Sequence, residues 1–226
     1  REAGLLEQRR DFQGRPQARL DFLKSLGVSP VAGSRLISLF AYENAGVASW
    51  LQALADDGQP THLLVPEGRV LADVQRWLGE EPLAPGCPQV RQSLTVQVLP
   101  FVRQEDYDRL LWCCDFNAVR GEDSFVRAQW AGRPMLWHIY RQDEDIHLDK
   151  LEAFLGLYTR TLSPGAKAAV LALWQAWNSE ASMAEPWKNL LQYWPEVAAH
   201  AEQWCLEQGS QPDLAAALVQ FYLNWI

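Results

Sequence analysis

The stretch Leu94–Trp130 reads LTVQVLPFVRQEDYDRLLWCCDFNAVRGEDSFVRAQW. Apolar and polar residues alternate over Leu94–Leu99, which predicts a strand, and Glu105–Leu110 has the spacing of a helix. The apolar run Leu111–Cys114 predicts a second, buried strand, and a second helix is expected over Ser124–Trp130. Strands separated by helices of about ten residues indicate βαβ units. The stretch therefore predicts an α/β fold with a parallel sheet and helices on both faces.

The same alternation continues on both sides of this stretch. The expected strands are Ser34–Phe40, His62–Val65, Leu94–Leu99, Leu111–Cys114 and Met135–Tyr140. The expected helices are two short ones before Gly27, then Ala48–Ala55, Val70–Leu78, Glu105–Leu110, Ser124–Trp130, Leu148–Thr159, Ala166–Asn178, Trp187–Glu207 and Leu214–Trp225. Trp174, Trp177 and Trp187 are predicted to pack in the core or between domains. The chain thus ends in a purely helical segment.

Composition narrows the class of protein. The 226 residues are 48% hydrophobic and 21% charged, which is typical of a soluble globular protein with a sizeable core. A net charge of -8 argues against a protein that tracks nucleic-acid phosphates. No apolar run reaches the roughly 18 residues of a membrane span. We therefore expect neither nucleic acid nor a membrane among the partners.

Cysteine, histidine and glycine patterns exclude several common sites. The four cysteines form no CxxC pair and the four histidines form no HxxxH or HxH set, so no metal is expected. Cys113 and Cys114 lie in an apolar run and are predicted to be buried free thiols, which fit the cytoplasm. The chain contains neither GxGxxG nor GxxxxGK[ST]. The commonest dinucleotide and P-loop sites are therefore excluded.

Three loops with unusual polar or aromatic content follow strands of the predicted sheet. They are Ala41–Asn44, Pro100–Gln104 and Asn117–Gly132. In open α/β sheets, ligands bind beyond the carboxyl ends of the strands. Because the three loops share that edge, we expect their side chains to converge on one site.

The third loop allows two interpretations. Glu122, Asp123 and Ser124 are residue types expected at any helix N-terminus, where they complement the helix dipole and its free N–H groups. The same N–H groups, together with Arg120 and the Ser124 hydroxyl, could instead bind a diphosphate. Capping statistics alone favour the structural interpretation.

The aromatic residues of the other two loops also allow two interpretations. Phe40, Tyr42 and Phe101 could stack on a nucleobase, or each could belong to the core. Gln104 could hydrogen-bond a base edge with its amide, or could simply begin the next helix.

Three segments resemble a known family. DYDRLLWCCDFNAVRGEDSFVRAQWAGRPMLWHIY (Asp106–Tyr140) closely resembles the bacterial arginine rhamnosyltransferases that modify elongation factor P, and SLFAYEN (Ser38–Asn44) and VLPFVRQEDYD (Val98–Asp108) resemble the same family in the same order. The resemblance covers essentially the whole chain. It implies a GT-B fold, of which this chain is similar to the Rossmann-like, nucleotide-sugar-binding C-terminal half.

The resemblance also implies an activity and roles for individual residues. The family transfers L-rhamnose from dTDP-β-L-rhamnose to one arginine of elongation factor P with inversion at the sugar, without a further cofactor. Phe40 and Phe101 would flank the thymine, and Gln104, with Val102 and Arg103 beside it, would recognise its edge. The residues expected to hold the diphosphate and its surroundings are Tyr42, Arg120, Gly121, Asp123 and Ser124. Glu122 corresponds to the essential, catalytic glutamate of the family.

The expected domain organisation follows from the same resemblance. Residues 1–30 would be a connector or the end of the N-terminal domain, residues 31–145 the nucleotide-sugar-binding domain, and residues 146–226 helices that complete it and pack toward the N-terminal domain. The family's aspartates that accept the arginine proton belong to that N-terminal domain. We therefore expect this chain, which begins at Arg1 rather than Met, to bind the donor weakly without turnover.

Two alternatives remain at this point. A related GT-B enzyme could use a UDP-sugar, which a comparison of donor nucleotides would reveal. A non-catalytic interaction module could dock a partner through the tryptophan-rich C-terminal helices, and would bind no nucleotide.

Overall fold

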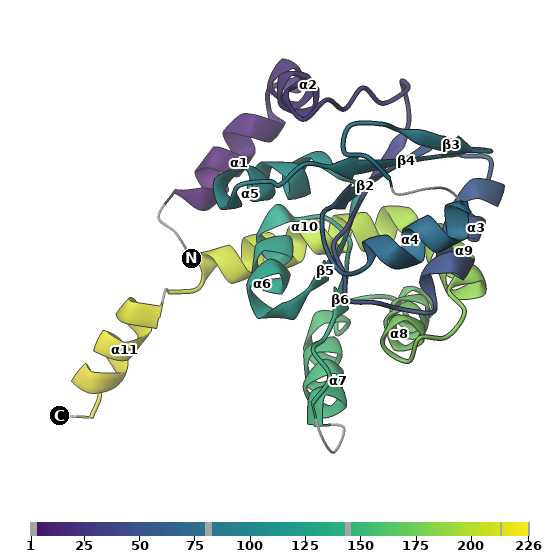
Figure 1. Ribbon diagram of the computed structural model, residues 1–226. Coiled ribbons are helices and arrows are strands. Elements are labelled where there is room, and N and C mark those ends of the chain that lie inside the picture. Colours follow the sequence, from purple (N-terminus) through teal and green to yellow (C-terminus); the bar gives the residue numbers. More distant parts are fainter. Residues whose placement is uncertain (1–3, 80–82, 143–145, 213, 226) are drawn as a thin grey trace.

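The computed structural model describes residues 4–79, 83–142, 146–212 and 214–225. Six strands form one sheet in the order β3-β4-β2-β1-β5-β6 (Figure 1). Their bounds are Arg35–Leu39 (β1), Thr61–Pro66 (β2), Gln89–Arg91 (β3), Leu94–Leu99 (β4), Phe116–Arg120 (β5) and Met135–His138 (β6). Every neighbouring pair is parallel except β3 and β4, which are antiparallel. The predicted α/β fold is confirmed, with one antiparallel edge strand that the sequence did not indicate.

The order of the parallel strands reverses once. The chain passes from β1 outward to β2 and then β4, and then returns to lay β5 and β6 on the opposite side of β1. Numbered along the chain, the five parallel strands therefore follow the order 3-2-1-4-5 of a Rossmann-type sheet. At this reversal the loops after β1 and β5 leave the sheet in different directions. Open α/β sheets bind ligands at such a reversal of strand order, beyond the carboxyl ends of the strands.

Helices cover both faces of the sheet (Figure 1). Helices α5 and α6 pack against each other and against α1, α2 and α10, whereas α3 packs against α4 and α9, and α8 lies against β6. The bounds are Leu5–Gln13 (α1), Pro16–Ser25 (α2), Val47–Asp56 (α3), Leu71–Leu78 (α4), Gln104–Cys113 (α5), Gly121–Ala131 (α6), Ile146–Tyr158 (α7), Pro164–Asn178 (α8), Ala184–Gln192 (α9), Trp194–Ser210 (α10) and Leu214–Leu223 (α11).

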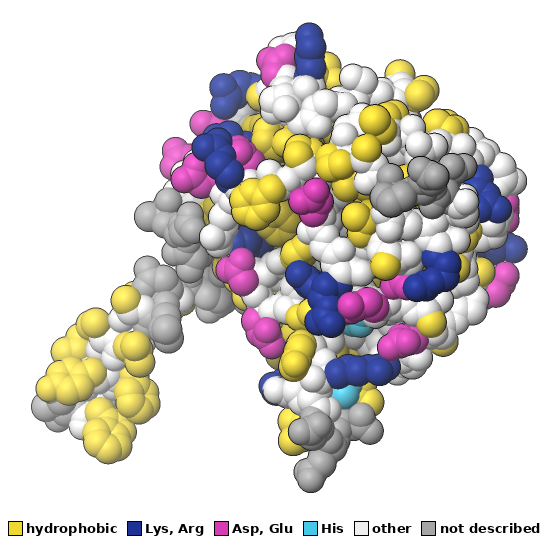
Figure 2. Space-filling model, in the orientation of Figure 1, with side chains coloured by type: hydrophobic (Ala, Val, Ile, Leu, Met, Phe, Trp, Pro, Cys, Tyr) yellow, Lys and Arg dark blue, Asp and Glu magenta, His cyan; other side chains and the backbone are white. Residues whose placement is uncertain are grey.

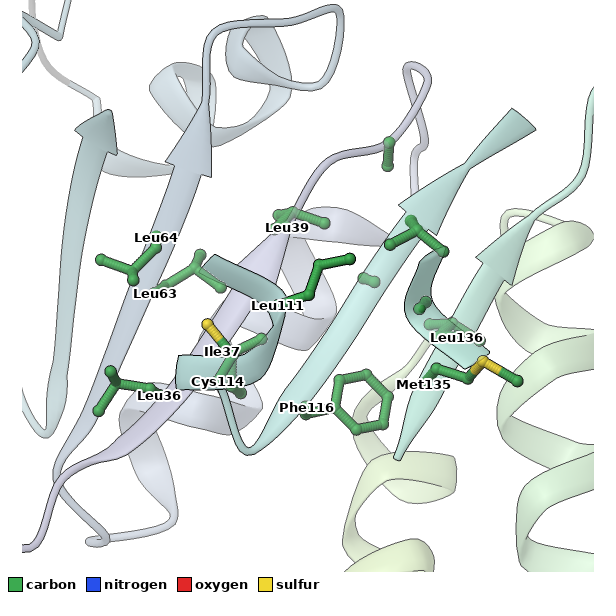
Figure 3. Close-up of a cluster of buried hydrophobic side chains, with 14 of the residues drawn as sticks. Leu36, Ile37, Leu39, Leu63, Leu64, Leu111, Cys114, Phe116, Met135 and Leu136 are labelled. Atoms are coloured by element: carbon green, nitrogen blue, oxygen red, sulfur yellow. The ribbon is translucent and has the colours of Figure 1, made fainter. Parts of the chain in front are cut away.

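The core lies between the sheet and these helices. Figure 3 shows Ile37 and Leu39 of β1 beside Leu63 and Leu64 of β2, with Leu111 of α5 over them. All of these side chains are fully or almost fully buried. Burial of a leucine side chain contributes about 1.5–3 kcal/mol, so this layer dominates the stability of the domain.

Tryptophans fill the other side of the core. The Trp50 ring makes edge contacts with Trp177 and Trp187, each with ring centroids 5.4 Å apart. Trp187 also contacts Phe116 of β5 at 5.1 Å. These rings, and Trp174, are buried, which confirms that Trp174, Trp177 and Trp187 belong to the core.

The predicted strand Leu111–Cys114 is wrong. Its first three residues complete helix α5, and the strand is β5, Phe116–Arg120, a few residues later. A short apolar run suits a buried strand or the buried side of a helix equally well, and α5 packs its run against the sheet. Strand β5 was missed because Asn117 looks polar, yet its buried amide donates to the Leu111 carbonyl at 3.1 Å.

Two helix boundaries also differ from expectation. The helix expected over Trp187–Glu207 is two helices, because α9 ends at Gln192 and α10 begins at Trp194 with Pro195 in its first turn. Proline has no N–H group to continue the preceding helix. Helix α6 begins at Gly121 rather than Ser124. Cys113 and Cys114 are buried and free, as predicted.

A buried ion pair fastens the first helix to the long helix α10. Arg9 is 1% exposed and donates two hydrogen bonds to the Glu202 carboxylate, at 2.7 and 2.6 Å, and one to the Ala131 carbonyl at 2.9 Å. The guanidinium fits because Gly132 lacks a side chain, and any Cβ there would overlap Arg9. Glu202 is 46% exposed, so only one of the two charges is deeply buried.

We predict that Glu202→Ala lowers the free energy of unfolding by about 2–3 kcal/mol, because it leaves a buried guanidinium without its carboxylate. Arg9→Met should lower the free energy of unfolding by a smaller amount, since methionine fills the space and Glu202 returns to water. Urea unfolding of both variants measures the difference. Glu207→Ala, on the same helix, is the control and should change stability by less than about 0.5 kcal/mol. An equal loss in both test variants would contradict the prediction.

Candidate functional site

Arg120 lies at the point where the strand order reverses. It is the last residue of β5, which pairs with β1, and its guanidinium carbon lies 4.5 Å from the ring centre of Phe40 and 5.0 Å from that of Tyr42. Both aromatic residues follow β1. Arg120 makes no ion pair with a carboxylate among the described residues. Two aromatic rings therefore hold a cation whose charge is available to an anion.

Helix α6 begins directly after Arg120. Gly121 turns the chain with a φ of 63°, which side chains disfavour, and a Cβ there would lie 3.4 Å from the Tyr42 hydroxyl. Trp137 fixes the turn by donating from Nε1 to the Gly121 carbonyl at 2.9 Å. No side chain caps this helix, so the expected capping role of Ser124 is wrong and Ser124 lies within the first turn. The free N–H groups at this end can bind an anion.

The acidic residues of the first turn have different surroundings. Asp123 accepts a hydrogen bond from Arg127 at 3.0 Å, and Arg127 also donates to the buried Asp108 of α5 at 2.8 Å. Glu122 is exposed and forms no hydrogen bond or ion pair with a described residue. Asp123 is therefore held in position, whereas Glu122 is free to contact a substrate.

A cavity of about 210 Å³ opens beside this helix end. Its lining residues are Phe40, Pro66, Glu67, Phe101, Val102, Gln104, Tyr107 and Ser124. Phe101 is 83% exposed, so it is not a core residue. The loops after β1 and β4 and the start of α6 therefore meet, as predicted from their shared sheet edge.

The remaining predicted site residues lie next to this cavity. Tyr42, Arg120, Gly121, Glu122 and Asp123 adjoin it at the β1–β5 end. The Arg103 side chain does not line the cavity, because its guanidinium pairs with Asp106 at 3.1 Å.

Sequence reasoning missed two parts of the site. Tyr107 of α5 forms a wall, with its ring 5.9 Å from that of Phe40, and burial raises its pKa well above the usual tyrosine value. The loop after β2, Pro66–Arg69, contributes a second wall. It could have been found, because it follows a predicted strand at the same sheet edge as the other three loops.

His138 lies beneath the site. It ends β6 in register with Arg120 and lies against the rings of Tyr42 and Trp177, at 5.2 and 5.6 Å. Burial, together with the charges of Arg141 and Arg120 and against the opposing charge of Glu43, lowers the pKa of His138 to about 4. The imidazole is therefore neutral at ordinary pH and adds no charge beside Arg120.

Comparison with known proteins agrees with this geometry. Residues 1–223 match the family model described as elongation factor P (EF-P) rhamnosyltransferase EarP. This chain belongs to that family. The resemblance predicted from three sequence segments is thus confirmed.

Two relatives illustrate the similarity. The protein-arginine rhamnosyltransferase of Pseudomonas putida is 60% identical over 224 residues, which cover 99% of this chain and 59% of the relative. That of Pseudomonas aeruginosa is 59% identical over 226 residues, which cover 100% of this chain and 60% of the relative. The chain therefore spans about 60% of the length of these rhamnosyltransferases.

A solved structure shows the same fold. The structure described as the structural basis for EarP-mediated arginine glycosylation of translation elongation factor EF-P superposes with a TM-score of 0.92 at 57% identity. It covers 100% of this chain, which in turn covers 72% of it. The predicted Rossmann-like α/β fold with additional C-terminal helices is confirmed.

Two further features are absent from the described residues of this EarP family member. No group of three or more His, Cys, Asp or Glu side chains there is placed to hold a metal ion. No helix in the same residues is long and apolar enough to cross a membrane.

We predict that His138 makes the fold acid-sensitive. Below pH 6.5 the unfolded chain takes up a proton on this residue, whereas the folded chain does so only near pH 4. The free energy of unfolding should therefore fall by about 3 kcal/mol as the pH drops through this interval, and be fully retained above it. His138→Phe keeps a ring against Tyr42, and its free energy of unfolding should lack this part of the pH dependence. Urea unfolding at pH 7 and pH 4.5 compares the two proteins, and an identical pH dependence would contradict the prediction.

Proposed function

We propose that this chain is the donor-binding half of an inverting glycosyltransferase that moves L-rhamnose from dTDP-β-L-rhamnose to an arginine of elongation factor P. One observation carries the proposal: Arg120, which has no carboxylate partner among the described residues, lies against two aromatic rings beside the uncapped start of α6. This is a receptor for a compact anion, and an aromatic cavity adjoins it. Family membership supports the identity of donor and acceptor.

The cavity fits a pyrimidine base. Phe40 and Phe101 offer faces for stacking, which contributes about 1–3 kcal/mol per base in related contexts. The Gln104 amide carries both a donor and an acceptor, matching the alternating edge of thymine. We propose that the backbone of Val102 and Arg103 completes this recognition.

The diphosphate would lie at the other end of the site. As the bond to rhamnose breaks, negative charge builds up on the leaving diphosphate. Arg120 and the N–H groups of Gly121 to Ser124 are fixed in the fold before the reaction, so they stabilise that charge without rearranging. We propose that Tyr42 positions Arg120 for this role through its ring.

The acceptor needs a carboxylate. A guanidinium stays protonated at ordinary pH and is then a poor nucleophile. A carboxylate that orients the arginine and accepts its proton removes this obstacle. The exposed Glu122 is our candidate for contacting donor or acceptor, and the resemblance places the proton-accepting aspartates in the N-terminal domain. We therefore expect this chain alone to bind the donor without turnover, and expect the enzyme to meet elongation factor P in the cytoplasm.

Calorimetric titration with dTDP-rhamnose and with UDP-N-acetylglucosamine tests the proposal. We expect dTDP-rhamnose to bind more tightly, and Arg120→Gln to weaken it about tenfold to hundredfold through lost charge-assisted hydrogen bonds. Arg109→Gln, which removes an exposed cation of α5, is the control and should not change binding. Tighter binding of the UDP-sugar would favour another GT-B donor, and absence of nucleotide binding would favour an interaction module. Turnover by this chain with elongation factor P would contradict the donor-half assignment.

The C-terminal helices supply a second part of the proposal. Helix α11 projects away from the rest of the chain (Figure 1), and Figure 2 shows it covered with apolar side chains. Its exposed residues are Leu218, Val219, Phe221, Tyr222 and Leu223, with Trp225 beyond them. Soluble monomers rarely expose such a continuous apolar surface. We propose that residues 146–226 complete the donor domain and pack α11 onto the N-terminal domain.

This proposal makes a prediction about the chain on its own. Without a covering surface, α11 should cause self-association that increases with concentration. Replacing Leu218 and Phe221 together with serine should reduce it, because both side chains are exposed and their loss does not disturb the core. Sedimentation velocity at several concentrations measures the effect. A clean monomer of the unaltered chain at high concentration would contradict the prediction.

A further inference from the structure

The loop after β2 occupies a defined place along the site. The strand order puts β2 between β4, whose loop carries Phe101 and Gln104, and β1, which leads to Phe40. On the far side of β1 lies β5 with Arg120 and the start of α6. The loop Pro66–Arg69 therefore lies between the proposed base end and the proposed diphosphate end.

Contacts on both sides fix this loop. Gly68 lies so close to Phe40 that a Cβ would approach the ring at 3.1 Å. Arg69 donates to Glu43 at 2.9 Å, and its guanidinium carbon lies 5.9 Å from the Tyr42 ring centre. The loop is thus held against both aromatic residues that follow β1.

Glu67 is the residue of this loop that remains unengaged. It lines the cavity and is its one carboxylate among the described lining residues. It forms no hydrogen bond or ion pair with a described residue. An ionised carboxylate only accepts hydrogen bonds, so its natural partner is a neutral hydroxyl or N–H group.

The spacing of the strands indicates which group of a bound ligand would lie beside the Glu67 carboxylate. Neighbouring strands lie about 4.8 Å apart, so roughly 14 Å separates the loop of β4 from the start of α6 across three spacings. A nucleoside diphosphate laid along this edge, with its base at Gln104 and its phosphates at Arg120, places its sugar over the β2 and β1 loops. The deoxyribose of a thymidine nucleotide carries one free hydroxyl, at the 3′ position.

We propose that Glu67 accepts a hydrogen bond from the 3′-hydroxyl of the donor's deoxyribose and so helps to select the nucleotide. This inference rests on the proposed donor site. Glu67 lies two strand spacings, about 10 Å, from the phosphate end, where water and salt screen the repulsion between like charges. Asp123 is less suited to the role, because Arg127 already holds its carboxylate.

The test pairs a change in the protein with a change in the ligand. Thymidine diphosphate and 3′-deoxythymidine diphosphate differ only in the proposed hydroxyl. We expect the unaltered chain to bind thymidine diphosphate about tenfold more tightly than the 3′-deoxy compound, as for one hydrogen bond to a charged group. In Glu67→Ala the two affinities should become equal. Glu67→Gln, which keeps an acceptor, should retain part of the difference.

Glu105→Ala is the matched control, because it removes an exposed carboxylate from the first turn of α5 without touching the cavity. It should preserve the tenfold ratio. Isothermal titration calorimetry of each of the four proteins with both nucleotides gives the affinities from which each ratio is taken. A ratio that survives in Glu67→Ala, or is absent from the unaltered chain, would overturn the role of Glu67 alone. Failure of thymidine diphosphate to bind at all would overturn the donor site and this role together.

Discussion

Strand β5 runs into helix α6 without an intervening loop, because Gly121 adopts a backbone conformation that side chains disfavour. The junction places the Arg120 side chain and the free N–H groups of the helix at one point. The junction also brings the Gly121 backbone close to the Tyr42 hydroxyl, and a side chain on residue 121 would crowd that hydroxyl. The anion receptor, its aromatic support and the mouth of the cavity all depend on this single turn.

Arg120 is held by aromatic rings, and this arrangement would let the proposed site both bind and release an anion. A carboxylate partner would neutralise the guanidinium and compete with the ligand. Aromatic faces orient the cation without neutralising it. The neutral His138 beneath Tyr42 keeps a second positive charge away from the same point. The site thus keeps its attraction for anions while its geometry stays fixed by packing.

Periodicity in the sequence predicted the sheet and the edge at which the site lies, because apolar strands and the loops between them leave clear signals. It failed at Leu111–Cys114, where the same apolar run served a helix, and at Asn117, whose polarity is satisfied by a backbone carbonyl. The expectation that loops at one sheet edge converge still identified Phe40, Phe101, Gln104 and Ser124. The real strand, β5, ends later in the chain than the predicted one, and its end lies closer to these residues. Tyr107 could not be assigned to the site without knowing the order of the strands, whereas the loop that carries Glu67 follows a predicted strand and could have been found.

The ion pair between Arg9 and Glu202 has a consequence for how the domain comes apart. It joins α1, near the beginning of the chain, to the long helix α10, which packs against α6. Neither segment can separate from the domain by itself without breaking the hydrogen bonds of this ion pair. Local fraying is thereby suppressed at both ends of the domain, and backbone amides in α10 should exchange with solvent only through opening of the whole unit. We expect the proposed donor site to rest on a platform that opens as a single cooperative body.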